Sequence, residues 1–195
     1  MAGHLAKAGH EVIVWNRSAG KSDSLKGQGA HVASSLEEVA QNCSVIFLCV
    51  GRTEDVEECL KQMTPFAEPG TLFVDHSTIS VPGAKAIHKD LAKRGLRFLD
   101  APITGGSMGA QKGQLTIFVG GRKVDFEEAL PLMRAYAKRA EWVGEAGAGQ
   151  TTKMANQIAV AGALLGLAES LAFAKMAGLD LALTREMLAG GAAGS

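Results

Sequence analysis

Short apolar segments alternate with helical segments along most of the chain, and this alternation most constrains the fold. Strand-like segments are expected at residues 11–15, 45–50, 71–75, 97–100, 115–119 and 141–143, with a further short piece after residue 27. Helical patterns are expected at residues 1–9, 21–27, 35–43, 55–63, 82–94 and 125–138. Residues 45–50 are apolar throughout, which is typical of a strand covered on both faces. Such repeated β-then-α units predict an α/β fold with a doubly wound, mostly parallel sheet.

The pattern changes after residue 100. Residues 101–113 are expected to form a glycine-rich loop, and a turn at 144–149 precedes a helical pattern over residues 150–177. At about 1.5 Å per residue this helix would be about 40 Å long, too long to cover one face of such a sheet. The chain therefore divides into residues 1–149 and 150–195, and in the second part a further helix is expected at 181–188, with no element at 190–195.

The long helix is also the most apolar part of the chain. Its segment 158–174 contains Glu169 and falls short of the roughly 20 apolar residues that a bilayer span needs, which favours a buried helix over a membrane helix. Three methionines in and after it, Met154, Met176 and Met187, are interpreted as core residues.

Composition excludes several functional classes. Lys+Arg and Asp+Glu both number 20, so net charge gives no reason to expect nucleic acid or an anionic membrane as partner. Three cysteines (Cys43, Cys49, Cys59) form no framework, and no basic-then-apolar leader opens the chain, which together indicate reduced thiols in a cytoplasmic protein. The five histidines lack ligand spacing, so no metal is expected.

The turn after the strand at 11–15 is a candidate cofactor site. A Rossmann-type nucleotide site would open with a strand and a G-x-G-x-x-G turn, whereas residues 1–9 already have the pattern of the helix that follows such a turn. The next turn contains Asn16, Arg17 and Ser18, where the adenosine ribose is read, and Arg there favours a 2′-phosphate. Alternatively, Arg17 is a solvated loop residue.

Two further turns follow strands of the expected sheet. Cys49 and Val50 precede Gly51, and Thr78 lies just beyond residues 71–75, where backbone amides and a hydroxyl could contact the ribose and phosphates of a dinucleotide. The alternative is turn and capping chemistry. Cys49 has no paired base in the sequence, so the pattern favours a core residue over a nucleophile.

Residues 100–110 hold the most distinctive loop. Thr104 offers a hydroxyl donor, and Gly105 and Gly106 allow backbone amides to approach a carboxylate closely. A flexible surface loop has a similar composition, but this one opens with the rigid sequence Asp100-Ala101-Pro102.

Lys153 is the strongest chemical candidate. It lies three residues before Asn156, on the same helix face, and the apolar residues 158–171 would desolvate its ammonium group and lower its pKa. Such a lysine can exchange a proton with a carbonyl or alcohol oxygen. The alternative is a surface lysine in the first turn of the helix.

In these motifs the chain resembles the β-hydroxyacid dehydrogenases, which include 3-hydroxyisobutyrate dehydrogenase and tartronate semialdehyde and glyoxylate/succinic semialdehyde reductases. Residues 100–110 with 113–121 are similar to the family's substrate loop and following strand, and residues 147–157 to the start of its catalytic helix. Residues 12–17, 49–51 and 75–78 match its cofactor-lining segments, so the resemblance spans essentially the whole chain.

The resemblance implies roles for these residues. Lys153 would be the catalytic acid/base, with Asn156 and Gln157 beside the substrate. Thr104, in place of the more usual Ser, would hold the substrate carboxylate together with Gly105 and Gly106. The reaction would be hydride transfer between NADP, or NAD as the alternative, and a small hydroxy acid or semialdehyde. Lys at position 153 argues against the related imine reductases.

The resemblance also implies two departures. The family's first strand and glycine loop would precede Met1, and its all-helical domain would continue past Ser195. Residues 1–149 would then be an incomplete dinucleotide-binding domain, and residues 150–195 an interdomain helix with the beginning of a truncated helical domain. Neighbours of the first strand would lack a pairing partner, and the exposed long helix would favour a homo-oligomer. The alternative function is a catalytically silent fragment that acts as a binding or assembly module.

Overall fold

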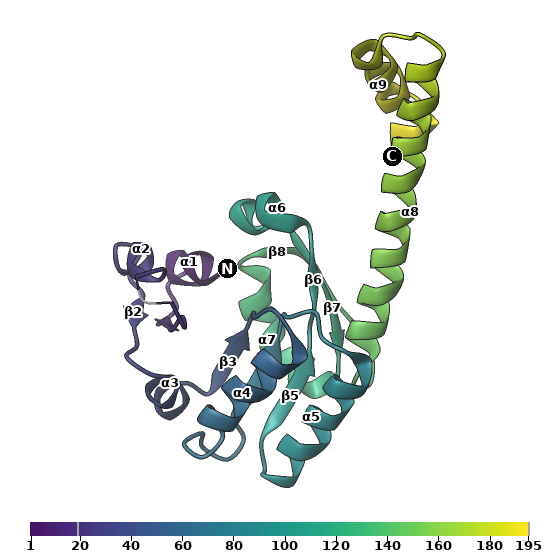
Figure 1. The fold of residues 1–195 in the computed structure, drawn as a ribbon. Helices are drawn as coiled ribbons and strands as arrows, with labels where there is room; N and C mark the ends of the chain where they lie inside the picture. Colours follow the sequence, from purple (N-terminus) through teal and green to yellow (C-terminus); the bar gives the residue numbers. More distant parts are fainter. Residues whose placement is uncertain (19, 195) are drawn as a thin grey trace. The chain divides into compact units, whose positions relative to one another are not determined.

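A computed structural model describes residues 1–18 and 20–194, which form two compact units, residues 1–153 and 154–195 (Figure 1). The elements of the first unit are α1 (Ala2–Lys7), β1 (Ile13–Val14), α2 (Asp23–Lys26), β2 (His31–Val32), α3 (Leu36–Asn42), β3 (Val45–Leu48), α4 (Thr53–Met63), β4 (Leu72–Asp75), α5 (Val81–Lys93), β5 (Arg97–Asp100), β6 (Ile103–Thr104), α6 (Gly106–Lys112), β7 (Leu115–Gly120), α7 (Lys123–Arg134) and β8 (Ala137–Gly144). Helix α8 (Ala148–Met176) begins in the first unit, and α9 (Leu181–Gly190) with a short 3₁₀ helix (Ala192–Gly194) completes the second.

The main sheet has six strands in the order β3-β4-β5-β7-β6, with β8 also paired to β7. Strands β3, β4 and β5 are parallel, as are β7 and β8, whereas β7 runs antiparallel to β5 and β6. Within the described ranges, β1 pairs with β2 alone and β3 with β4 alone. The predicted α/β class with a mostly parallel, Rossmann-like sheet is confirmed.

Both faces of the sheet are covered. Successive residues of a strand point to opposite faces, so neighbouring side chains belong to different cores. On one face, Phe73 and Phe98 belong to a core with residues of α3, α4 and α5, the last two of which Figure 1 shows on the same side of the sheet. On the other face, Val74 and Leu99 belong to a core with residues of α1 and α7. This double cover explains why the inner positions of β4 and β5 are apolar on both faces of the sheet.

The predictions for residues 101–113 and for the region around residue 138 are wrong. Residues 101–113 are not a loop, because β6 pairs with β7 and the short helix α6 follows it. The predicted helix over 125–138 ends at Arg134, and β8 begins at Ala137 rather than Glu141. Residues 137–140 are part of the sheet because they pair with β7, and no local sequence pattern predicts this pairing.

Cys49 is also placed differently from the prediction. Strand β3 ends at Leu48, and Cys49 is exposed rather than a core residue.

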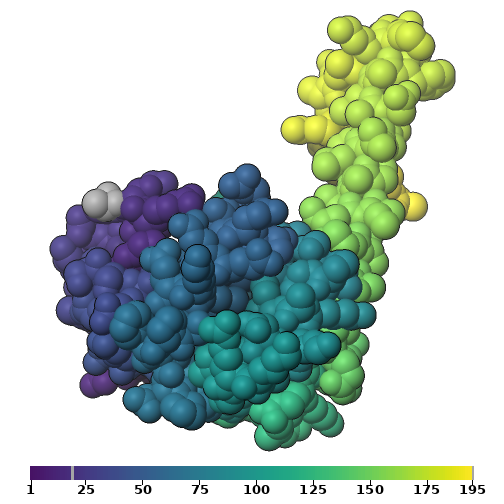
Figure 2. Space-filling view, turned by 60° about the horizontal axis from the view of Figure 1, so that its bottom comes forward, coloured from purple at the N-terminus to yellow at the C-terminus, as the bar shows by residue number. Residues whose placement is uncertain are grey.

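In the second unit, α8 is not the buried helix that its apolar composition suggested, but an exposed one, as the resemblance implied. Residues 157–170 are all exposed, among them Ile158 and Leu165 at 75% and 66%. Figure 2 shows one side of this part of the chain in green. By length and composition alone, α8 is apolar enough to cross a membrane, and little of it is buried in this structure. The methionines interpreted as core, Met154, Met176 and Met187, are exposed too. The reason is that no other described segment covers them.

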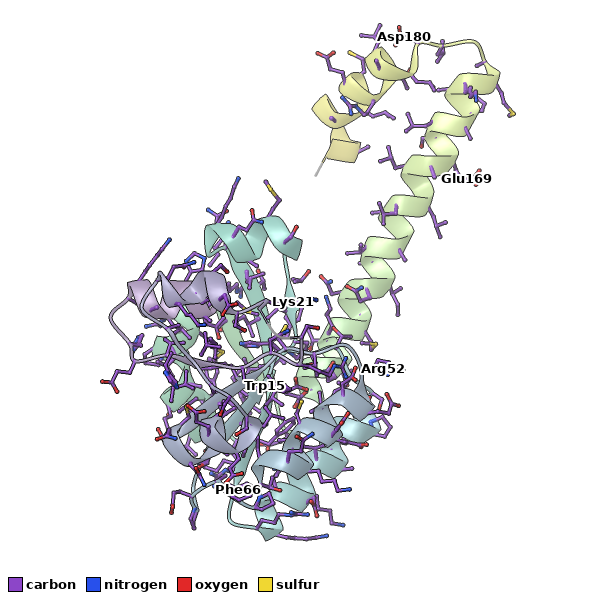
Figure 3. The ribbon with its side chains drawn as sticks, turned by 60° about the vertical axis from the view of Figure 1, so that its left-hand side comes forward. Trp15, Lys21, Arg52, Phe66, Glu169 and Asp180 are labelled. Carbon is purple, nitrogen blue, oxygen red and sulfur yellow. The ribbon has the colours of Figure 1, made fainter. Side chains whose placement is uncertain are left out.

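The rest of the second unit follows the expected elements. Asp180, labelled in Figure 3, caps α9 by accepting a hydrogen bond from the Leu183 amide at 2.9 Å. Residues 192–194, expected to be without structure, form a single 3₁₀ turn, and Ser195 lies outside the described residues. The boundary between the two compact units falls after Lys153 in the sequence, and the predicted domain division after residue 149 stays a prediction.

Candidate active site

The candidate residues of the first unit gather where the parallel strands end. Strands β3, β4 and β5 run in the same direction, so the segments that follow them lie along one edge of the sheet, where α/β proteins bind ligands. The Val50 amide donates a hydrogen bond to Ser77 Oγ at 2.8 Å, which ties the turn after β3 to the segment after β4. Ser77 is buried, whereas Thr78 beside it is exposed.

His76 ties the segment after β4 to the segment after β5. Its Nδ1 lies 2.6 Å from the Ala101 carbonyl oxygen and its Nε2 lies 2.7 Å from the Tyr136 hydroxyl, while Phe47 stacks on the ring. Burial lowers the pKa of His76 to about 4, so the ring is neutral at physiological pH. Nδ1 faces a carbonyl and must donate to it, so Nε2 accepts from Tyr136. Both ring nitrogens are therefore used within the fold.

The turn after β1 meets the start of α4. Arg17 Nη1 lies 3.3 Å from Asp55 Oδ1, and Arg52 Nε, whose side chain is labelled in Figure 3, lies 3.6 Å from Asp55 Oδ2. Both arginine side chains are about three-quarters exposed. Asn16 donates from Nδ2 to the Ser18 carbonyl at 2.9 Å and so closes the turn. Arg52 and Asp55 were missed at the sequence level, because only the fold brings them beside Arg17.

Cys49 lies in the turn after β3, next to Val50. Although the residue is exposed, desolvation raises the pKa of its thiol, and the nearby Asp75 adds to the rise. A thiol with a raised pKa is a poor nucleophile at neutral pH.

The loop after β5 turns sharply at its glycines. Thr104 pairs with Thr116 across β6 and β7 and is partly buried. Gly105 and Gly106, both exposed, have φ values of +119° and +62°, which residues other than glycine rarely adopt. The turn from β6 into α6 therefore requires this glycine pair.

Lys153 lies in the second turn of α8 and is 8% exposed, so it is no solvated surface lysine. Desolvation by burial lowers its pKa, in the predicted direction. The predicted cause is wrong, however, because residues 158–170, which were expected to bury it, are exposed. Asn156 and Gln157 belong to the second unit, where Asn156 Nδ2 donates to Gln157 Oε1 at 3.3 Å.

The fold and this edge of the sheet define a dinucleotide-binding α/β protein. Residues 1–144 match the model of the NAD binding domain of 6-phosphogluconate dehydrogenase, and residues 147–195 match that of the NAD-binding domain of NADP-dependent 3-hydroxyisobutyrate dehydrogenase. The chain belongs to the β-hydroxyacid dehydrogenase family of NAD(P)-dependent oxidoreductases.

Individual relatives agree with this assignment. An uncharacterized oxidoreductase of Shewanella frigidimarina is 41% identical over all of this chain and 68% of its own length. The 2-hydroxy-3-oxopropionate reductase of Escherichia coli is 38% identical, again over all of this chain and 68% of its own. The structure of Mycobacterium tuberculosis 3-hydroxyisobutyrate dehydrogenase with L-serine superposes with a TM-score of 0.90 at 30% identity, covering 98% of this chain and 66% of that one. The chain thus spans about two thirds of the length of these relatives.

Proposed function

We propose that this protein transfers a hydride between NADP(H) and a small hydroxy acid or its semialdehyde or oxo counterpart, with Lys153 as general acid and base. The observation that carries the proposal is the buried Lys153, with a lowered pKa, in the second turn of α8. A lowered pKa makes it easier for a lysine both to give and to take a proton.

The chemistry divides between cofactor and protein. When bound, the nicotinamide supplies the hydride for reduction and takes it up for oxidation. In reduction, the Lys153 ammonium donates a proton to the carbonyl oxygen as that oxygen becomes a hydroxyl, and in oxidation the neutral amine takes the proton back. Thr104, Gly105 and Gly106 hold the carboxylate of the substrate, while Asn156 and Gln157 orient its reacting end.

The residues present fit a dinucleotide with a 2′-phosphate. Arg17 and Arg52 place two exposed guanidinium groups on either side of Asp55, and guanidinium groups match phosphate in charge and geometry. Asn16 and Ser18 shape the turn that carries Arg17, and Cys49, Val50 and Thr78 line the phosphate and ribose path. This arrangement favours NADP over NAD, although Asp55 already neutralises part of the positive charge.

We further propose that the protein is cytoplasmic and pairs with a second copy through α8. The free cysteines suit a reducing compartment. The apolar side chains of residues 157–170 suit a protein partner more than water, since large apolar patches mark interaction surfaces. Light scattering of the purified chain tests this, and a monomer at all concentrations would contradict it.

The test of the function is NADPH oxidation with glyoxylate, succinic semialdehyde or tartronate semialdehyde. The Lys153→Ala variant is expected to lose about 100- to 10,000-fold in kcat, the range typical of a general acid. Lys89→Ala, which changes an exposed lysine on α5, serves as the matched control and should act as wild type. Equal, measurable rates for Lys153→Ala and wild type would overturn the role of Lys153, whereas no turnover and no NADPH binding by the wild type would favour a silent binding or assembly module.

A further inference from the structure

The first turn of α8 is capped by a residue far away in the sequence. Asp100, the last residue of β5, accepts hydrogen bonds from the Gly147 amide at 2.8 Å and from the Gln150 amide at 2.9 Å, one on each carboxylate oxygen. The first amides of a helix have no acceptor within the helix, and a carboxylate also suits the positive end of the helix dipole. Asp100 is 1% exposed, so this cap is shielded from water.

A second group of hydrogen bonds joins the same helical turn to the segment that follows β4. The Gln150 side chain is fully buried, and its Oε1 accepts from the Ile79 amide at 3.2 Å while its Nε2 donates to the Ser77 carbonyl at 2.8 Å. Both partners lie in the segment after β4, which is itself bonded to Val50. The amide side chain of Gln150 thus uses one donor and one acceptor to tie α8 to the candidate cofactor edge.

Close backbone contact leaves the helix start no room to shift. A Cβ atom on Gly149 would lie 2.2 Å from the Asp100 carbonyl oxygen and 2.6 Å from that of Phe118. Helix α8 therefore begins directly against the ends of β5 and β7.

Lys153 follows Gln150 by three residues, so the two share a helix face and lie about 4.5 Å apart along the axis. We infer that Asp100 and Gln150 are positioning residues, which fix the height and rotation of α8 so that Lys153 meets the reacting oxygen. The inference rests on the proposed function, since it concerns the proton transfer of that reaction. Small errors in placement matter here, because a shift of about 1 Å can cost about 100-fold in rate.

The test uses a substitution that pH can reverse. In Gln150→Glu, the ionised carboxylate cannot donate to the Ser77 carbonyl, whereas the protonated acid has one donor and one acceptor as Gln does. We expect kcat to fall at least ten-fold at pH 8, with KM values within three-fold of wild type, and the deficit to shrink as the pH is lowered toward 5.5. Gln150→Ala should stay slow throughout, and the exposed control Gln41→Glu should follow the wild-type profile.

A second variant tests the cap. Asp100→Asn keeps the shape but replaces one acceptor with an amide that faces a helix N–H, and a fall in kcat of at least ten-fold at unchanged KM is expected. Thermal unfolding of each variant shows whether the fold is retained. Losses confined to KM or to the melting temperature, or a Gln150→Glu deficit that does not change with pH, would overturn the inference.

A readout without turnover separates this inference from the proposed function. The pH dependence of Lys153 acylation by acetic anhydride, followed by mass spectrometry, reports the titration of its amine. In Gln150→Ala the midpoint should move toward the ordinary lysine value as the helix start loosens. An unchanged midpoint counts against positioning, whereas full turnover by Lys153→Ala sinks only the proposed function.

Discussion

Residues 147–153 and residues 157–170 lie at the start and in the middle of one helical stretch, yet their side chains and amides have opposite surroundings. At the start, Asp100 and Gln150 form four buried hydrogen bonds that join α8 to two strand ends. In the middle, every side chain is exposed, including Ile158 and Leu165. One part of the helix is therefore specified by polar contacts within the chain, and the other by its own helical propensity and by whatever surface it meets.

The difference shows where precision is needed. Buried hydrogen bonds are directional and costly to leave unmade, so they hold a helix at one height and rotation. Apolar contacts between copies tolerate small shifts. The chain places its directional bonds within one turn of Lys153, where the proposed reaction needs accurate placement, and the rest of α8 is mostly apolar.

The same substitution should have opposite effects in the two parts, and the larger effect belongs to the start. Gly149→Ala forces a Cβ atom against two backbone oxygens that strand pairing holds in place. We expect a loss of about 3 kcal/mol or more in the free energy of unfolding, measured by urea denaturation, because such overpacking cannot relax. A loss below about 1 kcal/mol would mean that the helix start can slide, and would break the comparison.

Most of the fold could be predicted from the sequence. The wrong predictions fall where a contact outside the local segment decides the structure. Apolar runs and helical periods predicted the order of elements and the two-sided sheet, because burial on both faces imposes that pattern on each strand. They failed for β6 and for the first half of β8, where pairing with β7 overrides the local preference. They also failed for α8, because an apolar helix looks alike whether it is covered by its own chain or by another molecule.

The candidate site was readable in part. Lys153 and the Thr104–Gly105–Gly106 segment stand out by residue type and spacing. Asp100 and Gln150 belong to the same motifs, but their spacing does not predict that they are hydrogen-bonded, since 50 residues and the three strands β6, β7 and β8 separate them. Asp55 was hidden for the same reason.

A second prediction concerns how stability depends on pH through Asp75, which is buried at the sheet edge next to the start of α8. Asp75 ends β4 beside Asp100 and is fully buried; its Oδ1 accepts from the Ser77 amide at 2.9 Å, while Oδ2 has no hydrogen-bond partner within the described ranges. Burial raises the pKa of Asp75 to about 7, with Asp100 adding to the rise and Ser77 opposing it.

The sign of the effect follows from proton binding. Between about pH 4 and 7 the folded state holds a proton on Asp75 that the unfolded state releases, so stability falls as the pH rises through this window. Asp75→Asn removes that dependence and should be more stable than wild type at pH 8 by about 2 kcal/mol. Urea denaturation from pH 4 to 8 checks this, with Asp90→Asn on the surface of α5 as control. Parallel pH profiles for wild type and Asp75→Asn would show that the edge is wet.

The smallest effect is expected in the exposed part of α8. Gly166→Ala adds a Cβ atom that meets nothing within 4 Å, and Ala is favoured over Gly in a helix interior by about 0.5–1 kcal/mol. Amide hydrogen exchange of residues 157–170 at low protein concentration should slow by about two- to five-fold, since protection reports local opening.

The same experiment at high concentration sharpens the comparison. If a second copy packs its backbone against Gly166, the added methyl group will weaken association and reverse the gain, whereas a gain at every concentration means that the contact between copies lies on another face of α8. Faster exchange even in the dilute chain would contradict the comparison itself, because position 166 would then be packed within its own molecule.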